Sequence, residues 1–448
     1  MPTHKVKKAK PQRHRWFDQW LVAKGDALCR LVDTTVHFLE QDEKHRGLRQ
    51  RARRAQDAAH FNASVDAVVS NMAYAILVPS ETGRIAVKLG SQRSGMTRYD
   101  NPALGSKPFR KLIHRLASLD VLSLKQADQR GEVSSIVPSE WFASKVGEHG
   151  ISLADFGRSA SEEVISLTRN RRSSGANEER VTERERIDYR ETRATRLYRD
   201  ELLNLNAFLA AADIAFIEDG LKPRVDPFDR TLRRHFVILS EQHQRFDQGG
   251  RLFGGFWMSL NAERRKNIRI NGEPVADLDF STMFTRLAYG RLGMEPPKGD
   301  LYAIAGAENH RSGIKMAMNT FLFDTHARRS AWPKEMGVGV GSDSEPRDPA
   351  FEARLPAGWT VGRTRKAILR CHPALEEAWG KALGYRLMFD ESRVLLLALN
   401  RLMTKSIPAL GMHDGLLVQR SKLEIAKAIM AKAAKEIAGV DIPVEEKE

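Results

Sequence analysis

The chain has 448 residues, enough for about three domains at the usual ~150 residues each, and it is strongly basic. Its formal net charge of +15, from 72 Lys and Arg against 57 Asp and Glu, predicts a polyanionic partner, with nucleic acid as the first expectation. No uncharged apolar run approaches the ~18 residues of a membrane span, and two cysteines, Cys29 and Cys371, are too few for a disulfide framework or a four-ligand zinc site. We therefore expect a cytoplasmic protein with no membrane partner.

The N-terminal part of the sequence has the features of a nucleic-acid-binding region. Residues 1–15 carry six Lys and Arg and no acid, which predicts a disordered basic arm, with a solubilising tail as the alternative. We expect residues 16–160 to form a mostly helical nucleic-acid-binding domain. Within it, residues 105–140 combine a helical pattern at 109–122 with two short strands at 125–137. This order resembles a winged helix, and the alternative is an ordinary α/β corner that does not contact DNA.

The middle of the chain changes composition. Residues 161–200 are crowded with Arg, Glu, Ser and Asn and contain few apolar side chains, so we predict a charged linker there. Residues 202–217 then have the pattern of a buried helix. The segments that carry candidate catalytic residues follow, within residues 201–448.

Two of these segments carry carboxylates. Residues 275–281 predict a short strand that ends near Asp279 and leads into a helix, and residues 408–418 predict two apolar strands around an Asp-Gly turn that presents Asp414. Taken alone, each Asp has a structural explanation, as a helix-entry residue or as a turn residue. Two carboxylates on neighbouring strands, however, suit two-metal phosphoryl transfer, because Mg²⁺ prefers oxygen ligands.

A third segment, residues 311–323, predicts a helix with one mixed ridge. Arg311, Lys315, Asn319 and Phe323 follow one another at a spacing of four residues and so share one side of the helix. The two cations suit triphosphate oxygens, and the aromatic ring suits a sugar or base. The alternative is a solvated stripe with Phe323 in the core.

In this order the three segments resemble motifs A, B and C of the right-hand polymerases. Asp279-Phe280-Ser281 with Arg286 is similar to the D-[YF]-S-x₄-R of family A DNA polymerases. His413-Asp414 resembles the His-Asp of motif C, which phage and mitochondrial single-subunit RNA polymerases share. The helical ridge resembles the R-x₃-K of motif B, and residues 247–253, which include Arg251, resemble a D-x-R-G-R-[VL]-[YF] template-binding element.

The resemblance implies a fold and an activity. The fold would be α+β, with a right-hand polymerase palm built on an antiparallel sheet and with helical fingers and thumb, all within residues 201–448. The activity would be that of a DNA-directed DNA polymerase that adds dNMPs to a 3′ end in DNA replication, with DNA template-primer and dNTPs as partners and two Mg²⁺ ions, or Mn²⁺, as cofactor. Nothing in the sequence indicates a protein partner.

Roles follow from the matched positions. Asp279 and Asp414 would ligate the metals, Lys315 and Arg311 would complete the catalytic set, and Arg251 and Arg286 would contact nucleic acid. The substrate would meet four further side chains: Phe284, Asn319, Phe323 and His413. Phe284 stands where DNA polymerases place a bulky residue against C2′ and where the RNA polymerases have glycine, so we expect selection of deoxynucleotides.

Several positions depart from the family pattern. Gly415 follows His413-Asp414 where family A has Glu, and Asn319 replaces an aromatic residue. The first 240 residues offer no obvious acidic cluster for a proofreading exonuclease, so we expect a polymerase without proofreading activity. Two alternatives stay open: an RNA polymerase or primase of the single-subunit type, and a DNA-binding replication or defence factor without catalysis.

Overall fold

The computed structural model describes residues 14–90, 96–128, 132–174, 180–239, 245–325, 332 and 355–447. The chain divides into two compact units, residues 1–163 with 218–229 and residues 164–217 with 230–448. Most of the predicted basic arm, residues 1–13, lies outside the described residues. Arg15 is not part of an arm, because it begins strand β1 (Arg15–Trp16) and its guanidinium donates a hydrogen bond to the Val78 carbonyl over 2.9 Å.

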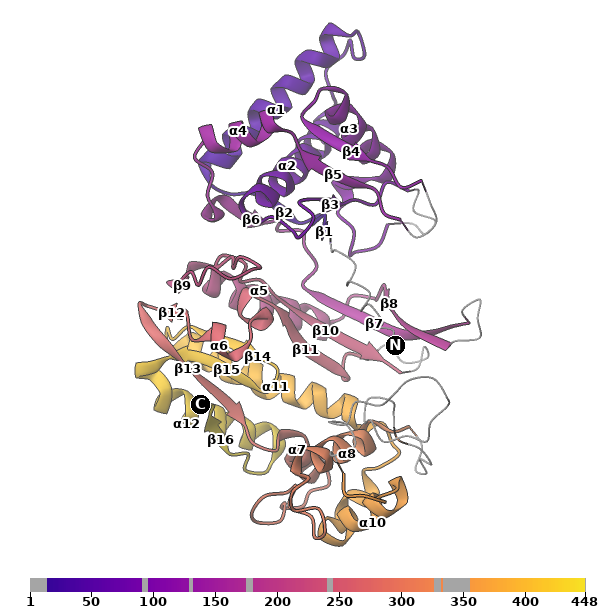
Figure 1. Cartoon of the computed structure of the whole chain (residues 1–448), viewed down its shortest axis with the longest axis vertical. Coiled ribbons are helices and arrows are strands. Elements are labelled where there is room, and N and C mark those ends of the chain that lie inside the picture. The colour runs from indigo at the N-terminus through magenta and orange to yellow at the C-terminus, as the bar shows by residue number, and fades with distance from the viewer. Residues whose placement is uncertain are drawn as a thin grey trace, which may run out of the picture. The chain divides into compact units, whose positions relative to one another are not determined.

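The described part of the first unit combines a small sheet with α-helices (Figure 1). The sheet has the order β1-β3-β5-β4, with β3 at Ile85–Ala86, β5 at Ser135–Pro138 and β4 at Leu122–Lys125. The helices are α1 (Asp26–His45), α2 (Ala55–Leu77), α3 (Ser106–Ser118) and α4 (Glu140–Glu148). A separate pair joins β2 (Leu21–Ala23) to β6 (Phe156–Arg158).

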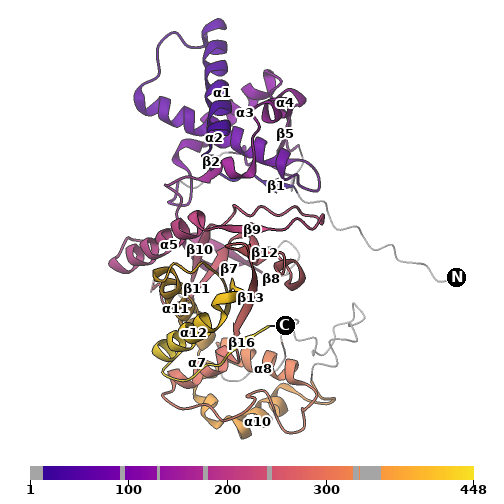
Figure 2. The same ribbon diagram turned by 90° about the vertical axis from the view of Figure 1, so that its left-hand side faces the viewer.

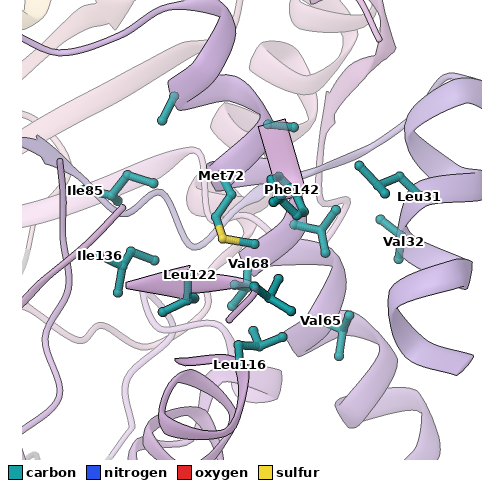
Figure 3. Close-up of a cluster of buried hydrophobic side chains, with 14 of the residues drawn as sticks. Leu31, Val32, Val65, Val68, Met72, Ile85, Leu116, Leu122, Ile136 and Phe142 are labelled. Carbon is teal, nitrogen blue, oxygen red and sulfur yellow. The ribbon is translucent and has the colours of Figure 1, made fainter. Parts of the chain in front are cut away.

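The core of this unit forms around helix α2. Figure 3 shows Val68 and Met72 of α2 between side chains of the other helices and of the sheet, among them Leu31, Phe142 and Ile136. Helix α3 contributes the residues that its pattern predicts, since Phe109, Leu112, Ile113 and Leu116 are all buried. The predicted order of a helix and two paired strands is present, but the helix ends at Ser118 and the first strand begins at Leu122, earlier than predicted. The winged-helix interpretation stays a prediction.

Residues 218–229 belong to this first unit, although the sequence analysis placed them in the C-terminal part. Two side-chain contacts explain the difference. The Tyr74 hydroxyl donates to Asp226 over 2.8 Å, and Arg224 donates to the Leu77 carbonyl over 3.1 Å. Both partners of this segment lie on α2, so the segment is part of the packing of that helix.

The second unit contains a sheet of order β11-β10-β7-β8. Its strands are β7 (Ile165–Ser174), β8 (Arg180–Ile187), β10 (Leu232–Ile238) and β11 (Gly249–Gly254). Residues 161–200, expected to be a charged linker, differ from that expectation, because β7 and β8 pair antiparallel and helix α5 (Arg193–Ala211) follows. The charges do not prevent a sheet here, since Arg169 pairs with Glu185 across the strands at 3.0 Å while Ile165 and Leu167 are buried.

The second sheet of this unit is antiparallel throughout and has the order β14-β15-β13-β12-β9, with β16 also paired to β13. Its strands are β14 (Ala409–Met412), β15 (Gly415–Gln419), β13 (Glu273–Phe280), β12 (Ile268–Ile270), β9 (Ile214–Phe216) and β16 (Val444–Glu446). The predicted strand at 275–281 and the predicted hairpin at 408–418 are both present. The predicted helix at 202–217 instead ends at Ala211, and β9 follows it.

Helices make up the rest of the second unit, so its fold class includes both helices and sheets. They are α6 (Ala262–Arg265), α7 (Met283–Arg291), α8 (Arg311–Phe323), α10 (Val361–Cys371), α11 (Leu383–Thr404) and α12 (Leu423–Ala438). Figure 2 shows α11 and α12 on the same side of β13. Ala276, Leu278 and Phe280 of β13 are buried, whereas the alternate residues are only half-buried. The fold is therefore α+β, and the helix predicted at 311–323 is confirmed.

Helix α11 is fixed by three consecutive buried polar residues, Asp390, Glu391 and Ser392. Asp390 accepts two hydrogen bonds from Arg291 of α7, at 2.6 and 2.8 Å, and Glu391 accepts two from Arg251 of β11. Ser392 accepts one from Arg234 of β10 at 2.9 Å.

Among the described residues, no helix combines the length and the apolar character that crossing a bilayer requires.

Arg234 is the most deeply buried of the three arginines, with 1% of its surface exposed, and it also donates to the Gly250 carbonyl at 2.9 Å. We expect Arg234→Ala to lower the free energy of unfolding by about 3–5 kcal/mol, because it removes a large buried side chain and leaves buried acceptors unpaired. Denaturant titration would measure this loss. Arg233→Ala, on the half-buried side of the same strand, is the matched control, and an equal loss in the two variants would contradict the prediction.

Candidate active site

The antiparallel pairing of β13 with β15 brings Asp279 and Asp414 together. In this register Asp279 lies opposite Gly415, and Asp414 is the residue just before it in the turn between β14 and β15. The Phe280 N–H donates to the Asp414 carbonyl over 2.9 Å, which holds the turn against the end of β13. The two carboxylates therefore lie side by side at one end of the sheet, as the sequence predicted.

The turn that presents Asp414 differs in detail from the predicted Asp-Gly turn. Its two residues are His413 and Asp414, and Gly415 is already the first residue of β15. His413 has φ +45°, a left-handed conformation that is uncommon outside glycine and that stores local strain. A Cβ at Gly415 would lie 2.3 Å from the Leu278 carbonyl oxygen. The position where family A has Glu cannot hold a side chain in this register.

The charge of Asp279 is poorly compensated. Burial, and then the negative charge of Asp414, raise the pKa of Asp279 to about 6, while Lys447 opposes the rise. The Oδ2 atom of Asp279 lies 2.8 Å from Nζ of Lys447. Its Oδ1 atom is buried and has no hydrogen-bond partner among the described residues. A buried carboxylate oxygen without a donor, beside a second carboxylate, is a place that a cation would stabilise.

The donor set fits a hard divalent cation. Mg²⁺ is usually bound by one or two carboxylates, with water and substrate phosphates completing its octahedron. Asp279 and Asp414 provide two carboxylates, and the described part of the chain holds no cluster of three or more His, Cys, Asp or Glu side chains that could bind a metal on their own. The remaining ligands would therefore come from water and substrate.

Arg251, predicted to contact nucleic acid, is held by a residue that the sequence did not reveal. Its Nε and Nη2 atoms donate to Glu391 over 2.5 and 3.0 Å, and its guanidinium carbon lies 5.3 Å from the ring centroid of Phe284. Burial raises the pKa of Glu391 to about 7, with Arg251 lowering it and the charges of Asp414 and Asp279 adding to the rise. The only signal for Glu391 is a run of four polar residues, Asp390 to Arg393, in an otherwise largely apolar helix.

Phe284, predicted to select the sugar, and Phe323, predicted to meet the substrate, lie together. The ring centroids of Phe284 and Phe323 are 5.8 Å apart, so the start of α7 meets the end of α8. Tyr385, which the sequence did not single out, packs edge-on against Phe323 at 5.2 Å. A Cβ at Gly384 would lie 2.6 Å from the Phe323 ring, so a glycine is needed for this contact.

The ridge of α8 presents its cations as predicted, but one of them is already paired. Arg311 donates to both oxygens of Asp300, at 2.7 and 3.1 Å, and lies over the Tyr302 ring at 5.1 Å. Lys315, one turn later, is exposed. Oδ1 of Asn319 is buried without a hydrogen-bond partner among the described residues, so this amide oxygen remains available to a donor.

The last two predicted residues contact the protein itself. Arg286 donates to the Thr282 hydroxyl over 2.8 Å and to the Asp441 carbonyl over 3.1 Å, which ties α7 to the segment before β16. The His413 ring lies 5.8 Å from that of Phe253 on β11. Burial and the charge of Arg251 lower the pKa of His413, and the charge of Asp414 opposes this shift.

Comparison of the sequence with models of known protein families found no match, and a search of curated proteins found none either. Neither comparison shows a family for this chain. Any functional assignment therefore rests on the motif resemblance and on the geometry of these side chains.

The raised pKa of Asp279 predicts a pH-dependent cost in stability. The unfolded carboxyl titrates near its ordinary pKa of 3.8 and the folded one near 6, so the cost of ionisation grows as the pH rises from about 4 to about 6 and is complete above that. We expect Asp279→Asn to stabilise the protein by on the order of 1 kcal/mol at pH 8 and by almost nothing at pH 4. Denaturant titrations across this range would measure the difference.

A second variant separates the causes of this shift. Asp414→Asn removes the neighbouring charge but leaves the burial, so the pKa of Asp279 should fall toward its ordinary value in a carboxyl NMR titration. A stability gain for Asp279→Asn that stays constant from pH 4 to pH 8 would contradict the assignment of the raised pKa.

Proposed function

We propose that this protein is a DNA-directed DNA polymerase that adds dNMPs to a 3′ end by two-metal phosphoryl transfer. The observation that carries the proposal is that Asp279 lies opposite Gly415, next to Asp414, at the end of an antiparallel sheet, and that the buried Oδ1 of Asp279 has no hydrogen-bond partner among the described residues. A helix that bears two cations and an aromatic residue, α8, reaches the helix that follows Asp279 through Phe323 and Phe284. These are the parts that phosphoryl transfer from a nucleoside triphosphate needs.

In this mechanism Asp279 and Asp414 would hold the two metal ions. Bound Mg²⁺ supplies activation of the primer 3′-hydroxyl and neutralisation of the triphosphate charge. The protein contributes the fixed separation of the two carboxylates, which the β13–β15 register and the Phe280 to Asp414 hydrogen bond set. In-line attack of the hydroxyl oxygen on the α-phosphorus forms the new phosphodiester bond and releases pyrophosphate.

The cations of α8 would bind the triphosphate. Lys315 is exposed and can reach a phosphate without losing a buried partner. Arg311 must exchange its two hydrogen bonds to Asp300 for bonds to phosphate oxygens. Because the carboxylate and the phosphate are both negative and the ion pair is exposed, this exchange costs little free energy. The basic net charge of the chain supports binding of the template and primer backbone.

An RNA polymerase or primase is the second candidate, because one observation favours it. Tyr385 places a phenol ring against Phe323, beside the pair expected to meet the sugar. A tyrosine in that position brings a polar group that Phe323 itself lacks. Incubation of primed and unprimed templates with dNTPs and NTPs supplied separately discriminates between these activities.

The metal-binding assignment predicts the effect of two substitutions. Asp279→Ala and Asp414→Ala should each reduce nucleotide addition by roughly a thousand-fold or more, because the metal-held charge stabilisation is worth several kcal/mol, and DNA binding should change little. Primer extension and a DNA-binding titration measure the two effects. Asp277→Ala, which removes a carboxylate from the same face of β13, is the control and should retain most activity. Near-normal extension by either of the first two variants would show that the site is misplaced.

The contact between Phe284 and Phe323 predicts the choice of sugar. A ribose 2′-hydroxyl buried against two phenyl rings loses its water without gaining a partner, at a cost of about 1–3 kcal/mol, so dNTPs should be preferred by roughly ten-fold or more. Phe284→Ala should raise NTP incorporation relative to dNTP incorporation, and Phe323→Tyr should have a smaller effect. If the unmodified protein extends primers equally well with both, the RNA polymerase or primase candidate takes precedence.

A further inference from the structure

The C-terminal strand places a lysine on the candidate metal ligand. Strand β16 pairs with the end of β13, with Glu445 opposite Asp279, and the Lys447 N–H continues the pairing by donating to the Asp277 carbonyl over 2.8 Å. Since side chains alternate along a strand, Lys447 lies on the same face as Asp277 and Asp279. Its Nζ atom lies 2.8 Å from Oδ2 of Asp279.

This ammonium group lies where a cation would bind. Asp279 and Asp414 repel each other when both are ionised, and the positive charge of Lys447 offsets part of that repulsion. The Lys447 side chain is 48% exposed, against 21% for Asp279, so water can replace the carboxylate as its partner. An ion pair with one exposed member is weak enough for a divalent cation to displace.

The structure also gives Lys447 a place to move. Lys447 lines a cavity of about 520 Å³ whose other charged residues are two acids, Asp277 and Glu446, and three cations, Arg265, Lys266 and Arg420, so Asp277 is the acceptor there that matters for an ammonium group. Asp277 is bound by Arg265 through Oδ2 at 3.0 Å, while its Oδ1 has no hydrogen-bond partner among the described residues. The side chain can therefore leave Asp279 while β16 stays in the sheet.

We propose that Lys447 is an internal counter-ion that competes with the catalytic cation for Asp279, so that metal binds only as the ammonium group moves away toward this cavity. The inference rests on the proposed function for the identity of Asp279 and Asp414 as metal ligands. By this inference, metal binding also depends on Lys447, which directly follows β16. A positive charge at position 447 must then weaken metal binding.

The test is direct measurement of Mn²⁺ binding to the full chain without substrate, by electron paramagnetic resonance of the unbound ion. Lys447→Gln removes the competing charge and should lower the Kd for Mn²⁺ by about three- to ten-fold, as expected for one half-exposed ion pair and one like charge beside the metal. Lys435→Gln is the matched control, because Lys435 pairs with Asp441 at 3.4 Å, is 49% exposed and lies on α12. The control should bind Mn²⁺ as the unmodified chain does.

Three further variants make each outcome decisive. Lys447→Arg keeps the charge and should leave the Kd within about two-fold of that of the unmodified chain, so a gain in both Lys447 variants would overturn the charge competition. If Lys447→Gln leaves the Kd unchanged while Asp279→Asn abolishes binding, the counter-ion inference fails and the metal site stands. If Asp279→Asn and Asp414→Asn both bind Mn²⁺ normally, the metal site and the proposed function fail as well.

Discussion

The second unit depends on one constraint, the burial of residues 390–392 on helix α11. A buried carboxylate or hydroxyl is tolerated only when its partners are in place, because an unpaired polar group in the interior costs more than its hydrogen bond returns. Here the partners are Arg291, Arg251 and Arg234, from three different elements. Any shift of α7, β11 or β10 along α11 would leave a buried charge or acceptor unpaired. Removal of any one partner would therefore be strongly destabilising.

The same helix sets the charge of the candidate active site. Glu391 lies close enough to Asp279 and Asp414 for their charges to raise its pKa, so three carboxylates share one region. Arg251 and Lys447 are the cations that contact them directly, through Glu391 and Asp279 respectively. The raised pKa values of Glu391 and Asp279 show that the negative charges of this region are not fully offset, and a bound cation would relieve their repulsion.

The sequence predicted the parts of this site that local patterns encode and missed those that depend on long-range pairing. The strand before Asp279, the hairpin that carries Asp414 and the helix 311–323 all have the hydrophobic period of their element, and all three are present. Residues 161–200 differ from the predicted linker because they form two paired strands and a helix, and a charge such as Arg169 pairs with Glu185 across the strands instead of being solvated. Glu391 and Lys447 were missed because neither lies near a motif in the sequence. Each reaches the site only through a strand register or a helix packing that no local pattern contains.

Two charged side chains of the site, Asp279 and Arg311, are held by internal partners, and this bears on how substrate would enter on the proposed function. Asp279 is paired with Lys447, and Arg311 is paired with Asp300. A nucleoside triphosphate that arrives with its divalent cation offers both replacements at once, a cation for Asp279 and phosphate oxygens for Arg311. In each exchange the protein partner is replaced by a ligand of the same charge. Lys447, Arg311 and Asp300 are exposed enough for water to solvate the groups that are released. A metal ion alone, or a triphosphate alone, would complete only one exchange. The internal pairs would therefore favour binding of the metal–nucleotide complex over either component, and they would do so without any large movement of the sheet that carries the two aspartates.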